Sequence, residues 1–169
     1  GLGTGALRPV PVDGSFRLDP VRLRQMMADD AAAGLDPLMV VSTIGSTAAG
    51  AVDPTHRIAA IASEFSSWLH VDAAWAGAAS MVSRLRSVVD GVELVDSLTW
   101  DAHKWLSVPM GAGMFFCKHP DALARAFGVD AAYIPNTAAG ADDLYKTSMQ
   151  WSRRFIGLKL LFVLAQHGD

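Results

Sequence analysis

The sequence has little cysteine, little net charge and no long apolar run. Its single cysteine, Cys117, cannot form an internal disulfide and is typical of a reducing, cytoplasmic compartment. The formal net charge is only −3 and the 14 Lys and Arg residues are scattered, so no nucleic-acid surface is expected. The longest apolar run, 155–165, is interrupted by Lys159 and is shorter than the roughly 20 residues of a membrane span. The five histidines show no ligand spacing with one another or with Cys117, so neither a metal nor a membrane is an expected partner.

What the sequence does have is a regular alternation of predicted strands and helices. With 51% apolar and 18% charged residues, the chain can bury a core. Strands are predicted over 7–12, 37–43, 68–71, 95–100 and 113–117, the last as a hairpin arm, and helices over 20–33, 54–66, 81–89 and 151–164. The strand at 37–43 is apolar throughout, which is typical of a parallel strand covered on both faces. This order predicts an α/β fold with a mainly parallel sheet, whose ligands lie outside the carboxyl ends of the strands.

Two Asp-Pro pairs are predicted to begin helices. Asp19-Pro20 and Asp53-Pro54 each place a capping carboxylate before a proline, whose missing N–H costs nothing at the first helical position. Between these pairs, the loop 45–50 follows a strand and carries Thr47. Its hydroxyl is placed to hydrogen-bond a cofactor, or else forms an ordinary turn.

An aspartate and a lysine stand where two predicted strands end. Asp72 closes the apolar strand 68–71, and a carboxylate buried there needs a cation; the alternative is an Asp that caps the next turn. Lys104 follows the strand 95–100 between His103 and Trp105, an apolar setting that favours the neutral amine an imine requires. The alternatives are a surface lysine and a packing histidine. A lysine that forms an imine and a carboxylate that keeps a ring nitrogen protonated together indicate pyridoxal 5′-phosphate as cofactor.

The chain resembles the group II pyridoxal-phosphate-dependent amino acid decarboxylases, the family of aromatic-L-amino-acid, histidine and glutamate decarboxylases. The resemblance is carried, in family order and spacing, by the segments 42–47, 50–54, 68–75 and 96–105 and by Arg153, Arg154, Leu158 and Lys159. It runs over nearly the whole chain. It implies the large domain of the fold-type I pyridoxal-phosphate enzymes, in incomplete form, and decarboxylation of an L-amino acid to an amine and carbon dioxide.

The resemblance also implies roles for individual residues. Lys104 would carry the imine, Asp72 would pair with the pyridine nitrogen, Ala74 would pack on one ring face and Thr47 would lie near the cofactor. His103 and Asp101 would lie close to the imine and the phosphate, although Asp101 departs from the asparagine often found at that position.

A tyrosine matches the family's mobile-loop tyrosine. Tyr133 would protonate the substrate carbon after carbon dioxide leaves and would reach the site of a second subunit, which implies a homodimer with shared active sites. Relatives with phenylalanine at this place tend to be aldehyde synthases, so the tyrosine favours a decarboxylase. The alternatives are an ordinary loop tyrosine, an aldehyde synthase or another carbon–carbon lyase of the same fold.

The resemblance divides the chain into two parts. Residues 1–150 correspond to the second half of the cofactor-binding large domain, with a mobile loop near 127–145, and 151–169 to a helix leading toward a small carboxy-terminal domain. The family's main phosphate contacts and its ring-stacking histidine would lie upstream of Gly1. A catalytically silent binding or assembly module is therefore a further alternative. We expect exposed sheet edges and apolar helix faces, and hence association, if the chain is made alone.

Overall fold

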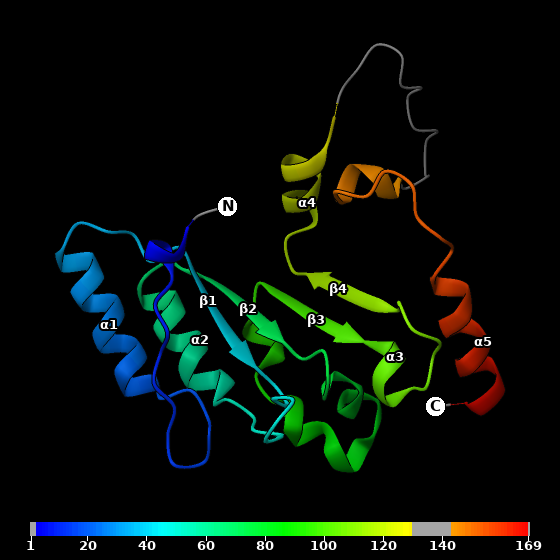
Figure 1. Cartoon of the computed structure of the whole chain (residues 1–169), viewed down its shortest axis with the longest axis horizontal. Coiled ribbons are helices and arrows are strands. Elements are labelled where there is room, and N and C mark those ends of the chain that lie inside the picture. The colour runs from blue at the N-terminus through cyan, green and yellow to red at the C-terminus, as the bar shows by residue number, and fades with distance from the viewer. Residues whose placement is uncertain (1–2, 130–142, 169) are drawn as a thin grey trace.

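The computed structural model describes residues 3–129 and 143–168, and within them a four-stranded sheet forms the centre of the molecule (Figure 1). The sheet order is β1-β2-β3-β4, with β1 at Met39–Thr43, β2 at Trp68–Asp72, β3 at Ser97–Asp101 and β4 at Gly113–Cys117. The first three strands are parallel, and β4 pairs antiparallel with β3. The predicted α/β class, the mainly parallel sheet and the hairpin arm are confirmed.

Helices of two kinds accompany this sheet. The α-helices are α1 (Pro20–Ala32), α2 (Thr55–Glu64), α3 (Ala102–Trp105), α4 (Pro120–Phe127) and α5 (Gly157–His167). The 3₁₀ helices are η1 (Thr4–Ala6), η2 (Gly77–Met81), η3 (Ser83–Val89), η4 (Val92–Leu94) and η5 (Leu144–Thr147). In Figure 1, α1 and α2 lie beside β1 and β2, whereas α5 lies at the far side near α3.

The main core lies between one face of the sheet and the helices α1 and α2. Val40, Leu69 and Val71 point into it from β1 and β2, and Ile58 meets them from α2. The other face is open in this chain: Met39 and Val41 are 52% and 55% exposed. The prediction that this strand is covered on both faces is therefore wrong here, because a continuous apolar run does not reveal which face its own chain covers.

Three predicted elements differ from the structure. The segment 7–12 forms no strand but only an isolated bridge between Val12 and Leu18, since its two prolines lack the N–H that a ladder needs. The segment 81–89 forms η3 instead of an α-helix; it has no side-chain cap and is rich in β-branched valine. The helix predicted from 151 begins only at Gly157, because Trp151 packs on Tyr145 and Arg153 bonds back to Ser148 and Leu144.

The two Asp-Pro pairs behave differently. Asp19 caps α1 as predicted, since its Oδ1 accepts hydrogen bonds from the Val21 and Arg22 amides at 2.8 and 3.3 Å. Asp53 caps nothing: its two carboxylate oxygens accept from the amides of Leu18 and Thr43, both at 2.7 Å. Asp53 thus ties the amino-terminal segment to the end of β1.

None of the helices in the described ranges is long and apolar enough to cross a membrane.

Candidate active site

The carboxyl ends of the three parallel strands meet at one edge of the sheet. Thr43 at the end of β1 pairs with Asp72 at the end of β2. Beyond it, the Asp101 amide donates to the Ala74 carbonyl at 3.2 Å, so the chain after β2 runs beside the end of β3. The segments that carry Thr47, Asp72 and Lys104 therefore leave the sheet at the same edge, as predicted.

Side-chain packing joins the three segments that leave this edge. Gly45, in the loop after β1, has φ +83°, and a Cβ built on it would lie 2.5 Å from the Cβ of Ala76 and 3.0 Å from Cε3 of Trp75. Only glycine fits this approach. Trp75 in turn meets Trp105 edge to face, with ring centroids 4.9 Å apart. The loop after β1 thus rests on the turn after β2, and that turn rests on α3.

Lys104 is held by a carboxylate from the end of the preceding strand. Its Nζ lies 3.1 Å from Oδ2 of Asp101, a pairing that the single turn of α3 brings about at i,i+3 spacing. The side chain of Lys104 is 33% exposed, so a ligand can reach the amine. The apolar setting predicted for this lysine is wrong, because the turn of α3 brings its amine beside the carboxylate of Asp101.

His103 is oriented from both sides. Its Nδ1 accepts a hydrogen bond from the Ala112 amide at 3.2 Å, and its Nε2 lies 3.7 Å from Oδ2 of Asp101. An Nδ1 that accepts leaves the proton of the neutral ring on Nε2, on the side of the carboxylate. Asp101, His103 and Lys104 therefore form one polar group in which Asp101 is the centre.

Asp72 is exposed at the end of β2, contrary to the buried carboxylate predicted. Its Oδ1 accepts a hydrogen bond from the Ala74 amide at 3.0 Å, so the residue does cap the following turn. Within the described ranges, Oδ2 has no hydrogen-bond or ion-pair partner and can accept one from a cation. The exposure has a physical cause: Asp72 lies on the sheet face that α1 and α2 leave open.

His70 shares the open sheet face with Asp72, two residues before it in β2. Its Nδ1 lies 2.8 Å from Oγ of Ser97, and its ring stacks on Phe115 with centroids 6.0 Å apart. Burial lowers the pKa of His70, and the nearby charge of Asp72 partly opposes this. The sequence could have shown that His70 lies beside Asp72, since residues two apart in a strand lie on the same face of the sheet.

The other predicted site residues lie at this edge or outside the described residues. Thr47 is exposed in the turn after β1, and its neighbour Ser46 acts as a turn former, accepting a hydrogen bond from the Ala51 amide at 3.1 Å. Ala74 is half-buried beside Asp72. Tyr133 lies outside the described residues, as does most of the predicted mobile loop.

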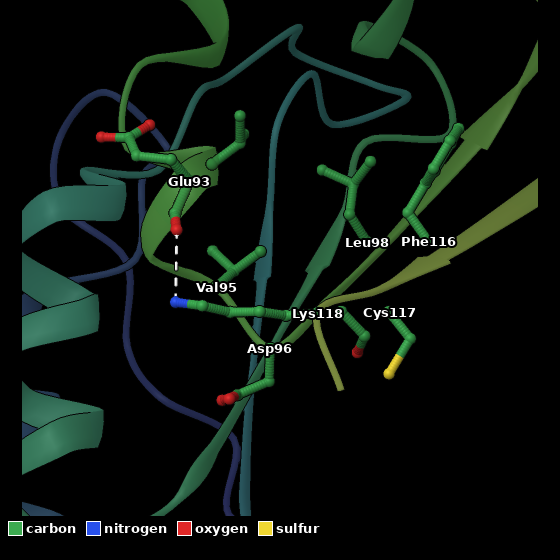
Figure 2. A pocket seen from close by; sticks show the side chains of 9 residues that line it. Glu93, Val95, Asp96, Leu98, Phe116, Cys117 and Lys118 are labelled. Carbon is green, nitrogen blue, oxygen red and sulfur yellow. Dashed lines mark hydrogen bonds between the residues drawn. The ribbon is translucent and has the colours of Figure 1, made fainter. Parts of the chain in front are cut away.

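A hollow of about 350 Å³ lies at the opposite edge, where β3 begins and β4 ends (Figure 2). Leu98, Phe116 and Cys117 contribute to its lining, and Lys118 donates to the Glu93 carbonyl at 3.4 Å beside it. It contains none of the residues that meet at the carboxyl edge. Among the described residues, no three His, Cys, Asp or Glu side chains are grouped to hold a metal ion.

The sequence from residue 2 to residue 169 matches the model of the pyridoxal-dependent decarboxylase conserved domain. The chain belongs to this pyridoxal-dependent decarboxylase family. The predicted resemblance to the group II decarboxylases is thereby confirmed.

Similar proteins of this family include plant enzymes. The chain is 38% identical to an aromatic-L-amino-acid decarboxylase of Catharanthus roseus over 96% of this chain and 33% of that protein. It is 39% identical to tyrosine/DOPA decarboxylase 2 of Papaver somniferum over 92% of this chain and 30% of that protein. The chain thus spans about a third of the length of the curated relatives it matches.

Solved structures of the family share the fold. Oryza sativa TDC with PLP and tryptamine superposes with a TM-score of 0.94 and 36% identity, over 98% of this chain and 35% of that one. Rhodiola rosea 4-hydroxyphenylacetaldehyde synthase superposes with a TM-score of 0.88 and 34% identity, over 99% of this chain and 34% of that one. The fold-type I α/β architecture is therefore shown for this chain, over about a third of the length of those structures.

The residues at the carboxyl edge fit one half of pyridoxal phosphate, the cofactor of this decarboxylase family. A reachable lysine amine suits the aldehyde, and an exposed carboxylate with an open oxygen suits a protonated ring nitrogen. The guanidinium groups of Arg153 and Arg154 belong to the segment before α5, and Arg153 is engaged with Ser148 and Leu144. The group formed by Asp101, His103 and Lys104 holds the lysine amine beside a carboxylate and an imidazole, which suits the imine end of the cofactor.

Proposed function

We propose that this chain supplies the imine-forming lysine and the ring-nitrogen carboxylate of a pyridoxal-phosphate-dependent amino acid decarboxylase. The observation that carries the proposal is the meeting of Asp72 and Lys104 at one sheet edge. The Trp75–Trp105 contact and the Ala74–Asp101 hydrogen bond join the segments that carry them. The reaction would convert an L-amino acid to the corresponding amine and carbon dioxide.

The residues would divide the work as follows. Pyridoxal phosphate, when bound, supplies an aldehyde for amines and a ring that accepts the electron pair left by departing carbon dioxide. Lys104 would provide the amine that anchors it, and Asp101, 3.1 Å from Nζ, orients that amine and can take a proton from it. His103 would present its Nε2 proton on the same side. Asp72 would use its open Oδ2 to keep the ring nitrogen protonated.

Three further assignments extend this proposal. Ala74 and Thr47 would border the cofactor ring, because both lie in the segments that leave the carboxyl edge. Tyr133 would return a proton to the substrate carbon. Residues 1–150 would be the second half of the cofactor-binding domain and 151–169 the helix leading out of it.

Aromatic L-amino acids are the substrates we propose first. The curated relatives above are named for aromatic amino acids, tyrosine and DOPA. Because the chain spans about a third of those relatives, the substrate and the activity are proposed for a protein that includes the remaining elements. A homodimer with shared sites is proposed as its assembly, in keeping with the exposed apolar side chains of the open sheet face.

An aldehyde synthase is the second candidate. It is favoured by the Rhodiola rosea structure, which matches this chain as well as several decarboxylases do. The two reactions differ in product: an amine and carbon dioxide in one case, and an aldehyde, ammonia and carbon dioxide in the other, where molecular oxygen is the oxidant and is reduced to hydrogen peroxide. A Tyr133→Phe variant that shifts the product from amine to aldehyde would support the decarboxylase assignment of the unaltered protein.

The proposal is tested by mixing the chain with pyridoxal phosphate and following the visible absorbance of the imine. We expect a band that is lost in Lys104→Ala, weakened in Asp72→Asn and unchanged in Lys118→Ala, whose lysine lies at the other edge of the sheet. A folded longer protein that contains this chain together with the remaining elements of the family, and still shows no such band, would instead support the catalytically silent module.

A further inference from the structure

Lys159 of α5 bridges two carbonyls of the loop that follows Lys104. Its Nζ donates to the carbonyl oxygens of Pro109 and Met110 at 2.9 and 3.0 Å, across sequence separations of 50 and 49 residues. The side chain is half-buried between its helix and that loop. A lysine ammonium has three protons to donate, and two of them close this bridge.

The loop that Lys159 holds has a backbone that needs outside support. It runs from residue 106 to 112, and within it Ser107 has φ +55° and Gly111 has φ +87°. A left-handed conformation costs a non-glycine residue such as Ser107 free energy, and it persists only when its surroundings fix it. The two carbonyls bound by Lys159 lie between these two positions.

The far end of the loop returns directly to the proposed site. The Ala112 amide donates to His103 Nδ1 at 3.2 Å, and the Ala112 carbonyl accepts from the Ala102 amide at 2.9 Å. At the next residue, a Cβ built on Gly113 would lie 3.1 Å from Oδ1 of Asp101. The end of the loop therefore bonds to His103, and the residue that follows the loop pairs with Asp101 in the sheet.

Apolar packing keeps Lys159 above the loop. Ile156, Leu160 and Val163 pack on a small core made of Ala102, Val108 and Ala112. At spacings of three from Ile156 and four from Val163, Lys159 lies on the same side of the helix as these two residues. The helix thus presents one lysine to the loop from a fixed distance.

We propose that Lys159 is a positioning residue for Lys104, which it influences through the 106–112 loop, His103 and Asp101. This inference rests on the proposed function for its biological meaning. The simpler alternative is that Lys159 only fastens α5 to the molecule. The two roles predict different effects when the ammonium is removed. A positioning role predicts a change at the Asp101–Lys104 pair, whereas a fastening role predicts a change spread evenly over the fold.

The test compares three variants of the full chain: Lys159→Met, which keeps the length of the side chain, Lys159→Arg, which keeps its donors, and Lys118→Met as control. Lys118 also donates from an exposed position to a backbone carbonyl, but at the other edge of the sheet. Amide hydrogen exchange is followed by mass spectrometry. We expect exchange in 106–112 to rise about tenfold in Lys159→Met, to stay near normal in Lys159→Arg and not to change in Lys118→Met.

A second readout follows the amine itself without any cofactor. The rate of acetylation of Lys104 should rise severalfold in Lys159→Met, because the pairing of Lys104 with Asp101 loosens. In Lys159→Arg the rate should be close to that of the unaltered chain. Unchanged acetylation of Lys104, or faster exchange spread evenly over the sheet, would overturn the positioning role. Failure of the unaltered chain to form an imine with pyridoxal phosphate would instead count against the proposed function, and leaves these two readouts decisive for Lys159.

Discussion

Replacing Gly45 with alanine should separate the segments that form the candidate site. The added Cβ would lie 2.5 Å from the Cβ of Ala76, a residue only 1% exposed, and 3.0 Å from the ring of Trp75. Neither neighbour can move away freely: Ala76 is buried in the core, and Trp75 is packed against Trp105. The loop that carries Thr47 must therefore shift, or the turn after Asp72 must.

The expected cost has two parts. A left-handed backbone costs alanine about 1–2 kcal/mol relative to glycine, and Gly45 has φ +83°. Overpacking a buried contact adds about 1–3 kcal/mol. Gly50 belongs to the same loop and has φ +63°, but nothing lies within 4 Å of its Cβ position, so Gly50→Ala should carry only the first part.

Urea unfolding of the unaltered chain, Gly45→Ala and Gly50→Ala measures both the backbone cost and the overpacking cost. The free energy of unfolding should fall by about 2–5 kcal/mol in Gly45→Ala and by about 1–2 kcal/mol in Gly50→Ala. The difference between the variants isolates the contact with Trp75 and Ala76. Equal losses in the two variants would show that the loop does not rest on this turn, and the reasoning about how the segments meet would fail.

Three other measurements test separate parts of the structure. Burial lowers the pKa of His70 from its ordinary value of 6.5, although the charge of Asp72 partly opposes the shift, so the unfolded chain binds a proton at His70 at a higher pH than the folded chain does. The free energy of unfolding should therefore fall as the pH drops below 6.5. Urea titrations of His70→Gln should show a smaller dependence of this free energy on pH. Asp53→Ala should lower the free energy of unfolding by about 2–4 kcal/mol, because the amides of Leu18 and Thr43 lose their acceptor. The control Asp36→Ala, at an exposed position, should change it by less than about 0.5 kcal/mol. Equal effects would contradict the role of Asp53 in joining the amino-terminal segment to β1. Val41→Lys, on the open sheet face, should lower the apparent mass measured by light scattering, and an unchanged mass would place the association elsewhere.

Local signals in the sequence predicted the elements whose causes are local. Asp19 caps the helix that follows it because its partners are two and three residues away. The same Asp-Pro pattern at Asp53 failed as a cap, because its carboxylate finds partners 35 and 10 residues away that no local pattern shows. Proline likewise decided the amino-terminal segment, where strand propensity was outweighed by missing N–H donors.

The candidate site was predictable in position but not in detail. Strand order alone brings Asp72 and Lys104 to one edge, since parallel strands end together. The hydrogen bond from Ala112 to His103 depends on the path of the 106–112 loop, which composition does not encode. The pairing of Lys104 with Asp101 depends on the short helix α3, which was not predicted from the sequence. The exposure of Asp72 depends on which face of the sheet the helices of this chain cover.

The most direct measurement is the place where pyridoxal phosphate attaches to the chain. The sequence holds four lysines, so reduction of the complex with borohydride and peptide mass spectrometry can compare Lys104 with Lys118, Lys146 and Lys159 in one sample. We predict that most of the label is on Lys104 and that Asp72→Asn reduces it there and nowhere else. A label spread over the four lysines, and unaffected by Asp72→Asn, would contradict the proposed site.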